Sequence, residues 1–318
     1  MDVLMILTGL AFLFAGGEGL VKGSVVLAEK LNISTLLVSV VVVGFGTSSP
    51  ELMVSVAAGL QNAPDIALGN IVGSNIANVL LILGLSAIIY PLACTRSEIK
   101  RDAWAVFFAS ALLSALSLYG HLNWLSGLIM LVILVVYICY SYFADTQRIR
   151  VQLAPCPQSE SVIEKKPMSL GKASFLVLIG LVMLVCGAHF LINGATAIAE
   201  TLGIPSAIIG LTLVALGTWL RELVEQGRAA YRKHADVVIG NILGSNLFNI
   251  LGIVGLTAVL NPIPFAGRIA EIDVWIMLLV AIACLPIIRT GLKISRLEGV
   301  AFLSLYVIYT SWIYITGS

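Results

Sequence analysis

Residues 69–78 of this 318-residue chain read GNIVGSNIAN, and residues 240–249 repeat them as GNILGSNLFN. Both strings lie inside apolar sequence, where amides and hydroxyls are costly to bury in a membrane and most often coordinate ions. The offset that aligns Gly69 with Gly240 also aligns Gly46 with Gly217 and Glu51 with Glu222. The chain is therefore built from two related halves rather than around one short motif.

The composition predicts a protein of the lipid bilayer. Hydrophobic residues make up 59% of the sequence and charged residues 11%, and the mean hydropathy is +1.03, values that a soluble domain of this size does not reach. Apolar runs long enough to cross a bilayer predict an all-α membrane protein with ten transmembrane helices, five in each half. They cover residues 3–28, 36–60, 66–91, 102–120, 123–143, 172–200, 207–230, 236–261, 271–288 and 297–315.

The distribution of basic residues predicts the orientation. Most of the 18 Lys and Arg residues fall in the loops after the odd-numbered helices, and such basic loops face the cytoplasm. We therefore expect a multi-pass protein of the cell (inner or plasma) membrane with both termini outside. Because five is an odd number, the second five-helix repeat must be inverted relative to the first. The first repeat covers residues 1–143, a cytoplasmic linker 144–171, and the second repeat 172–318.

Several function classes find no support in the sequence. The five cysteines show no CxxC spacing and the three histidines stand away from the repeated motifs, so neither a disulfide framework nor a zinc site is predicted. No Ser/His/Asp set accompanies the carboxylates, so we predict neither an enzyme nor a cofactor. No basic patch with interleaved aromatic residues indicates nucleic-acid binding. The expected partners are membrane lipid and small cations, and nothing indicates an oligomeric state.

Residues 43–51, VGFGTSSPE, would lie midway along the second helix. Pro50 cannot donate an amide hydrogen bond, so the helix should kink and free a carbonyl oxygen near Gly46. With the Glu51 carboxylate and nearby hydroxyls, that oxygen suits a hard cation such as Ca²⁺. Alternatively, the small residues only allow close helix packing and Glu51 is a neutral, hydrogen-bonded acid. The recurrence of Glu51 as Glu222 favours the cation site.

The third and eighth predicted helices each carry a polar stripe at four-residue spacing, which places its members on one helix face. The two stripes are Asn70, Ser74 and Asn78, and Asn241, Ser245 and Asn249. Such stripes offer amide and hydroxyl oxygens without adding charge. Asn75 and Asn246 point elsewhere and are expected to tie neighbouring helices together.

The motif GTSSPEL at 46–52 resembles the GTSxPE signature of the sodium/calcium exchanger (cation/Ca²⁺ antiporter) superfamily, prokaryotic type with two α-repeats, and the GNxxGSNxxN strings resemble its following helix. The resemblance implies that Na⁺ and Ca²⁺ are the transported ions, competing for overlapping sites, and that the first and sixth helices slide over the other eight. It implies a cation site formed by Gly44, Thr47, Ser48, Glu51, Ser74, Asn78, Ala215, Thr218, Glu222, Ser245 and Asn249, with Glu51 and Glu222 as the charged ligands. The GNxxE-type motif of proton-coupled Ca²⁺ exchangers is absent.

The second half departs from the family pattern. Where the first half reads GTSSPE, the second reads GTWLRE, so Trp219 replaces a hydroxyl and Arg221 replaces the proline. An Arg beside the site would repel Ca²⁺ electrostatically, which would weaken Ca²⁺ binding by roughly several kcal/mol. Three alternatives follow. Arg221 pairs with Glu225 or Glu18 and transport persists, or it neutralises Glu222 and impairs transport, or the segment was engineered.

Glu18 and Lys22 lie one turn apart in the first predicted helix and are expected to form an ion pair, which either steadies a moving helix or serves the ion pathway. For the whole chain we predict a secondary active antiporter that exchanges Na⁺, or H⁺, for Ca²⁺ or a related divalent cation. The alternative is a transport-impaired scaffold or sensor of the same fold.

Overall fold

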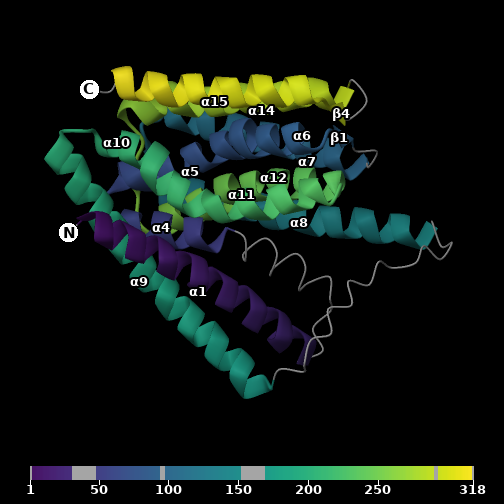
Figure 1. The fold of residues 1–318 in the computed structure, drawn as a ribbon, viewed down its shortest axis with the longest axis horizontal. Helices are drawn as coiled ribbons and strands as arrows, with labels where there is room; N and C mark the ends of the chain where they lie inside the picture. The colour runs from purple at the N-terminus through teal and green to yellow at the C-terminus, as the bar shows by residue number, and fades with distance from the viewer. Residues whose placement is uncertain (1, 31–47, 94–96, 152–168, 290–292, 317–318) are drawn as a thin grey trace.

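The structure is a computed structural model that describes residues 2–30, 48–93, 97–151, 169–289 and 293–316 (Figure 1). Its helices are α1 (Asp2–Lys30), α4 (Ser49–Leu60), α5 (Pro64–Ala77), α6 (Gly84–Ile89), α7 (Ser97–Ser117), α8 (Trp124–Val151), α9 (Leu170–Leu202), α10 (Ser206–Ile209), α11 (Ala215–Tyr231), α12 (Ala235–Leu247), α13 (Gly255–Leu260), α14 (Val274–Arg289) and α15 (Arg296–Thr316). Four π-helical segments adjoin them: η2 (Asn78–Leu83), η3 (Gly210–Val214), η4 (Phe248–Val254) and η5 (Ile269–Asp273).

The helix bounds agree with the predicted runs to within a few residues at most ends. Of the run 36–60, the structure describes only the part from 48 onward. Six described helices are long and apolar enough to cross a membrane, or seven if the bent pair Ala207–Leu220 and Glu222–Tyr231 counts as one span. These helices confirm a multi-pass membrane protein built from α-helices.

The helices that contain the doubled strings are the most deeply buried. In Pro64–Ile89, 89% of the most apolar stretch is buried, and in Val237–Leu260 the fraction is 78%, against 17% for Trp124–Ala144. Close contact at the centre depends on glycine: a methyl group added at Gly69 would lie 2.9 Å from the Leu211 backbone nitrogen. The repeated sequence therefore occupies the middle of the bundle, where it can position side chains from both halves.

Helices α1 and α9 pack against each other and diverge from the main body of the bundle (Figure 1). Glycines at seven-residue spacing make this contact possible. A methyl group at Gly16 would lie 2.8 Å from the Gly180 carbonyl oxygen, and one at Gly187 would lie 2.9 Å from the Gly9 carbonyl oxygen. The pairing of early with late glycines makes the two helices antiparallel, with their backbones in contact.

The predicted ion pair in α1 is present. The Lys22 Nζ lies 2.5 Å from the Glu18 Oε1, and both side chains are exposed on the protein surface. The pair therefore lies on the outer side of α1, and both roles considered for it remain predictions.

Two short strand pairs join the halves. Strand β1 (Leu92–Ala93) pairs antiparallel with β4 (Lys293–Ile294), and β2 (His121–Leu122) pairs antiparallel with β3 (Ile263–Pro264). The offset that aligns Gly69 with Gly240 carries β1 onto β3, and it carries β2 onto β4 with a shift of a single position. Each strand pair thus joins one strand from each half, and the repeat offset relates one pair to the other, as expected for two pseudo-symmetric repeats.

Candidate functional site

Buried polar side chains gather where α4, the α5–η2 helix, α11 and the α12–η4 helix meet. Each of the following is at most 7% exposed: Ser48, Glu51, Ser74, Asn78, Thr218, Glu222, Ser245 and Asn249. Ala215 is fully buried beside them on α11, and its carbonyl oxygen accepts a hydrogen bond from the Thr218 hydroxyl at 2.9 Å. Gly44 and Thr47, also predicted for the site, lie outside the described residues.

Helix α4 begins at Ser49, next to the proline for which the sequence predicts a kink. Ser48 has a non-helical backbone (φ −97°, ψ 13°), and Pro50 stands in the first turn, where its missing N–H leaves no bond unmade. Glu51 is buried in that same turn, where the helix dipole favours a negative charge. The described backbone thus shows a non-helical Ser48, and the kink predicted for the second helix stays a prediction because the residues before 48 lie outside the described structure.

Asn70 connects three helices. Its amide nitrogen donates to the Ser55 hydroxyl at 2.9 Å and to the Glu51 carbonyl oxygen at 3.3 Å. Its amide oxygen accepts from the Thr218 hydroxyl of α11 at 3.1 Å. Asn70 thus fixes the two carboxylate helices relative to each other, a role that its place in the polar stripe did not reveal.

A second set of hydrogen bonds joins the two stripe helices. Asn78 donates to the Asn246 amide oxygen at 3.0 Å, and Asn246 donates to the Asn75 carbonyl oxygen at 3.4 Å. Asn249 donates to the Ser74 hydroxyl at 3.3 Å. Asn246 therefore ties neighbouring helices as predicted. The Asn75 amide instead donates within its own helix, to the Ile71 carbonyl at 2.7 Å, so the prediction was wrong for that side chain.

The stripes end in π-helical turns at equivalent places. Segment η2 begins at Asn78, and η4 begins at Phe248, one residue before Asn249. π-Helical turns inside α-helices occur frequently at functional sites. Here they widen the backbone where the last amide of each stripe lies.

Glu222 is held by the stripe of its own half. The Ser245 hydroxyl donates to the Glu222 Oε1 at 2.7 Å. Glu222 and Glu51 thus place two buried carboxylates among neutral amides and hydroxyls. Buried carboxylates need compensating charge or hydrogen bonds, and a set made only of oxygen ligands suits Na⁺ or Ca²⁺ rather than a transition metal.

The departures in the second half are visible in α11. Trp219 is 4% exposed and packs in the main hydrophobic core, with no hydrogen-bond acceptor for its indole N–H among the described residues. Gln226 is also buried, and it stands where the first half has Ser55. The segments Ala207–Leu220 and Glu222–Tyr231 meet at 51°, so the chain bends at Arg221 without a proline. The side chain of Arg221 lies outside the described part of the structure, and Glu225 is half-buried.

The chain is similar to known proteins over nearly its whole length. The model of the sodium/calcium exchanger protein family matches residues 1–143 and 172–315. Sodium/calcium exchanger MaX1 of Methanosarcina acetivorans is 30% identical, over 97% of both chains, and the putative antiporter CaxA of Alkalimonas amylolytica is 31% identical, over 96% of both. A structure of the sodium-calcium exchanger NCX_Mj soaked with Na⁺ and Sr²⁺ is 30% identical, with a TM-score of 0.64 over 98% of this chain and 97% of that one.

Proposed function

This chain belongs to the sodium/calcium exchanger family, whose members are antiporters and not enzymes, and we propose that it exchanges Ca²⁺ for Na⁺ rather than for H⁺. The proposal is supported chiefly by two buried carboxylates, one from each half, among neutral oxygen ligands. Neither half contains the GNxxE-type motif of proton-coupled relatives.

In the proposed site, Glu51 and Glu222 supply the negative charge. Hydroxyl and amide oxygens complete the coordination from Thr47, Ser48, Thr218, Ser74, Ser245, Asn78 and Asn249, with backbone carbonyls from Gly44 and Ala215. Six to eight oxygens at about 2.3–2.6 Å are typical for Ca²⁺. The same oxygens would hold Na⁺ when Ca²⁺ leaves, so the two ions compete for overlapping positions.

The proposed architecture is ten spans in two inverted five-helix repeats, residues 1–143 and 172–318, joined by a cytoplasmic linker at 144–171. The reciprocal pairing of β1 with β4 and of β2 with β3 supports the repeat relation. The basic loops support an orientation with both termini outside the inner or plasma membrane. The gap between residues 143 and 172 in the family match supports the linker.

Uptake of radiolabelled Ca²⁺ into proteoliposomes tests the coupling ion. An outward Na⁺ gradient should drive uptake into vesicles of equal pH, and an outward proton gradient without Na⁺ should not. Glu51→Gln should abolish uptake, while Glu271→Gln, a matched change at an exposed carboxylate of η5, should leave it intact. Uptake driven equally well by the proton gradient would refute Na⁺ coupling.

A second candidate is a transport-impaired exchanger in which Arg221 neutralises Glu222. The buried Trp219 supports this alternative, because it adds bulk and no oxygen ligand where the first half has Ser48. If the parent protein takes up no Ca²⁺ and a Trp219→Ser/Arg221→Pro variant does, this candidate replaces the first.

A further inference from the structure

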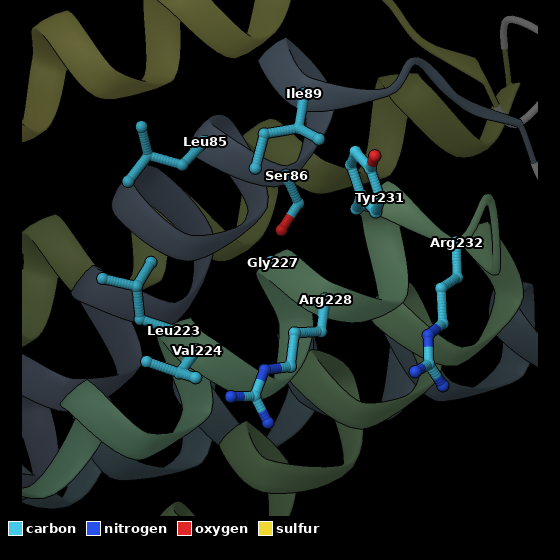
Figure 2. A pocket seen from close by; sticks show the side chains of 9 residues that line it. All are labelled: Leu85, Ser86, Ile89, Leu223, Val224, Gly227, Arg228, Tyr231 and Arg232. Atoms are coloured by element: carbon cyan, nitrogen blue, oxygen red, sulfur yellow. The ribbon is translucent and has the colours of Figure 1, made fainter.

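An apolar groove of about 630 Å³ lies between α6 and the second half of α11. Leu85 and Ile89 line it from α6, and Leu223 and Val224 line it from α11 (Figure 2). Ile89 and Val224 are 45% and 43% exposed. The groove is therefore open at the surface of the bundle, and its walls suit a hydrocarbon chain.

One end of the groove is positively charged. Val224 and Arg228 lie four residues apart on one face of α11, and Arg232 follows directly after the helix end, so the lining changes from apolar to cationic toward that end. Figure 2 shows the two guanidinium groups extending in the same direction from α11. In the part of the chain that the structure describes, neither arginine forms an ion pair with a carboxylate.

The charged end also has the other features of a membrane interface. Tyr231 lines it and is 81% exposed, as is usual for tyrosines at the level of lipid headgroups. The Ser86 side chain faces α11 beside Gly227 (Figure 2), is 1% exposed, and has no hydrogen-bond partner for its hydroxyl among the described residues. A methyl group at Gly227 would meet only Ile89, at 4.0 Å, so the groove has free space there.

The first half lacks this charge. When Gly240 is aligned with Gly69, Arg228 corresponds to Ala57 and Arg232 to Gln61, both neutral. The site of Ser86 corresponds to Thr257, whose hydroxyl donates to the Ile253 carbonyl at 2.7 Å. The charged groove thus belongs to one face of the membrane only and is not a requirement of the repeated fold.

We infer that this groove binds an anionic phospholipid, with an acyl chain along Leu85, Ile89, Leu223 and Val224 and the headgroup phosphate at Arg228 and Arg232. An apolar groove that ends in two guanidinium groups, neither of them paired with a carboxylate among the described residues, matches the two parts of such a lipid. Arginine binds phosphate oxygens in bidentate geometry. Only the choice of leaflet, the cytoplasmic one, depends on the orientation proposed above. Because α11 also carries Glu222, the lipid would contact the helix that contributes to the cation site.

Native mass spectrometry of the full-length protein in detergent tests the headgroup contact. The protein is titrated with phosphatidylglycerol, or with phosphatidylcholine that has the same acyl chains. Each arginine should contribute about fivefold to the affinity, so Arg228→Gln/Arg232→Gln should weaken phosphatidylglycerol binding by about 25-fold. The control Lys293→Gln/Arg296→Gln removes two exposed charges elsewhere and should change it less than twofold. The inference would be overturned if the two double variants lost phosphatidylglycerol affinity equally, or if neither lost any. Equal affinity of the parent protein for the two lipids would also overturn it.

A second pair of variants tests the acyl chain without altering charge. Gly227→Leu should fill the groove and reduce phosphatidylglycerol binding at least tenfold, whereas Gly227→Ala should bind as the parent does. Unchanged thermal unfolding shows that both variants are folded. Parent-like binding by Gly227→Leu, or displacement of the lipid by inorganic phosphate, would exclude a lipid chain in the groove. These measurements need no transport, so their failure is distinct from a failure of the proposed antiport.

Discussion

Helices α4 and α11 each carry one of the two carboxylates of the proposed site, and the backbone that holds the carboxylate differs between them. Helix α4 starts beside Glu51, after a non-helical Ser48 and with Pro50 in its first turn. Helix α11 continues through Glu222 as one helix that bends by 51° at Arg221. The stripe helices that support them instead carry matching polar residues and matching π-helical turns. The supporting helices thus match in sequence and in their π-helical turns but differ in side-chain hydrogen bonds, and the carboxylate helices differ in their backbones as well.

The most severe test of this difference is to neutralise each carboxylate in turn. If Glu51 and Glu222 both ligate the ion, Glu51→Gln and Glu222→Gln should each reduce Na⁺-driven Ca²⁺ uptake by about 100-fold or more, since losing one charge partner of a buried cation costs about 3 kcal/mol or more. If Arg221 already neutralises Glu222, uptake by the parent should already be low and Glu222→Gln should leave it unchanged. Initial uptake rates in proteoliposomes, normalised to reconstituted protein, distinguish the two results.

The next largest effect is expected from comparing Asn70 with its second-half counterpart Asn241, through the free energy of unfolding. Asn70→Ala should lower the free energy of unfolding by about 2 kcal/mol, because it removes the buried hydrogen bonds that Asn70 makes with Ser55 and Thr218. Its counterpart Asn241 is half-buried and makes no side-chain hydrogen bond within the described residues, so Asn241→Ala should cost less than about 1 kcal/mol. Unfolding monitored by tryptophan fluorescence in detergent measures both, and equal losses would contradict the asymmetry.

Restoring the first-half sequence in α11 should have a smaller effect. The variant Trp219→Ser/Arg221→Pro gains a hydroxyl and loses a positive charge near Glu222, which should raise the apparent affinity for Ca²⁺ by about tenfold, or about 1.4 kcal/mol. The control is Arg296→Gln, which removes an exposed charge far along the chain. An unchanged affinity in the double variant would mean that Arg221 does not act on the site. Isothermal titration with Ca²⁺ provides the measurement.

Removing the Ser245 hydroxyl, which lies beside Glu222, should have the smallest effect on Ca²⁺ binding. Ser245→Ala removes the hydrogen bond to the carboxylate and should weaken Ca²⁺ binding about fivefold, in line with about 1 kcal/mol for such a bond. Ser74→Ala is the matched change in the first half, where the hydroxyl donates to the Ile71 carbonyl at 3.0 Å instead. A smaller loss of Ca²⁺ affinity for Ser74→Ala than for Ser245→Ala in the same titration would support the difference between the two halves. A larger loss for Ser74→Ala would argue against it.

The sequence predicted the fold well where composition and repetition act directly. The doubled strings indicated two related halves, and the structure places both strings in deeply buried helices. The kink predicted at Pro50 stays a prediction, because residues 31–47 lie outside the described structure. Asn246 was predicted to join helices because it lies off the polar stripe.

Features that depend on tertiary contacts escaped prediction. Asn70 bonds to Thr218 in the opposite half of the chain, and no local pattern indicates that approach. The π-helical turns at η2 and η4 leave no compositional sign, because they differ from α-helix only in which carbonyl each amide meets. The groove at Arg228 also stayed hidden, since its second wall comes from α6, which belongs to the first half.

The glycine contacts between α1 and α9 have a mechanical consequence. Two helices whose backbones touch along their length cannot shift independently, so the pair behaves as a single lever. Leu10 of this lever lies against Gly217, next to Thr218 in the site. A displacement of either helix during the proposed exchange would therefore carry the other with it and move Leu10 relative to Gly217.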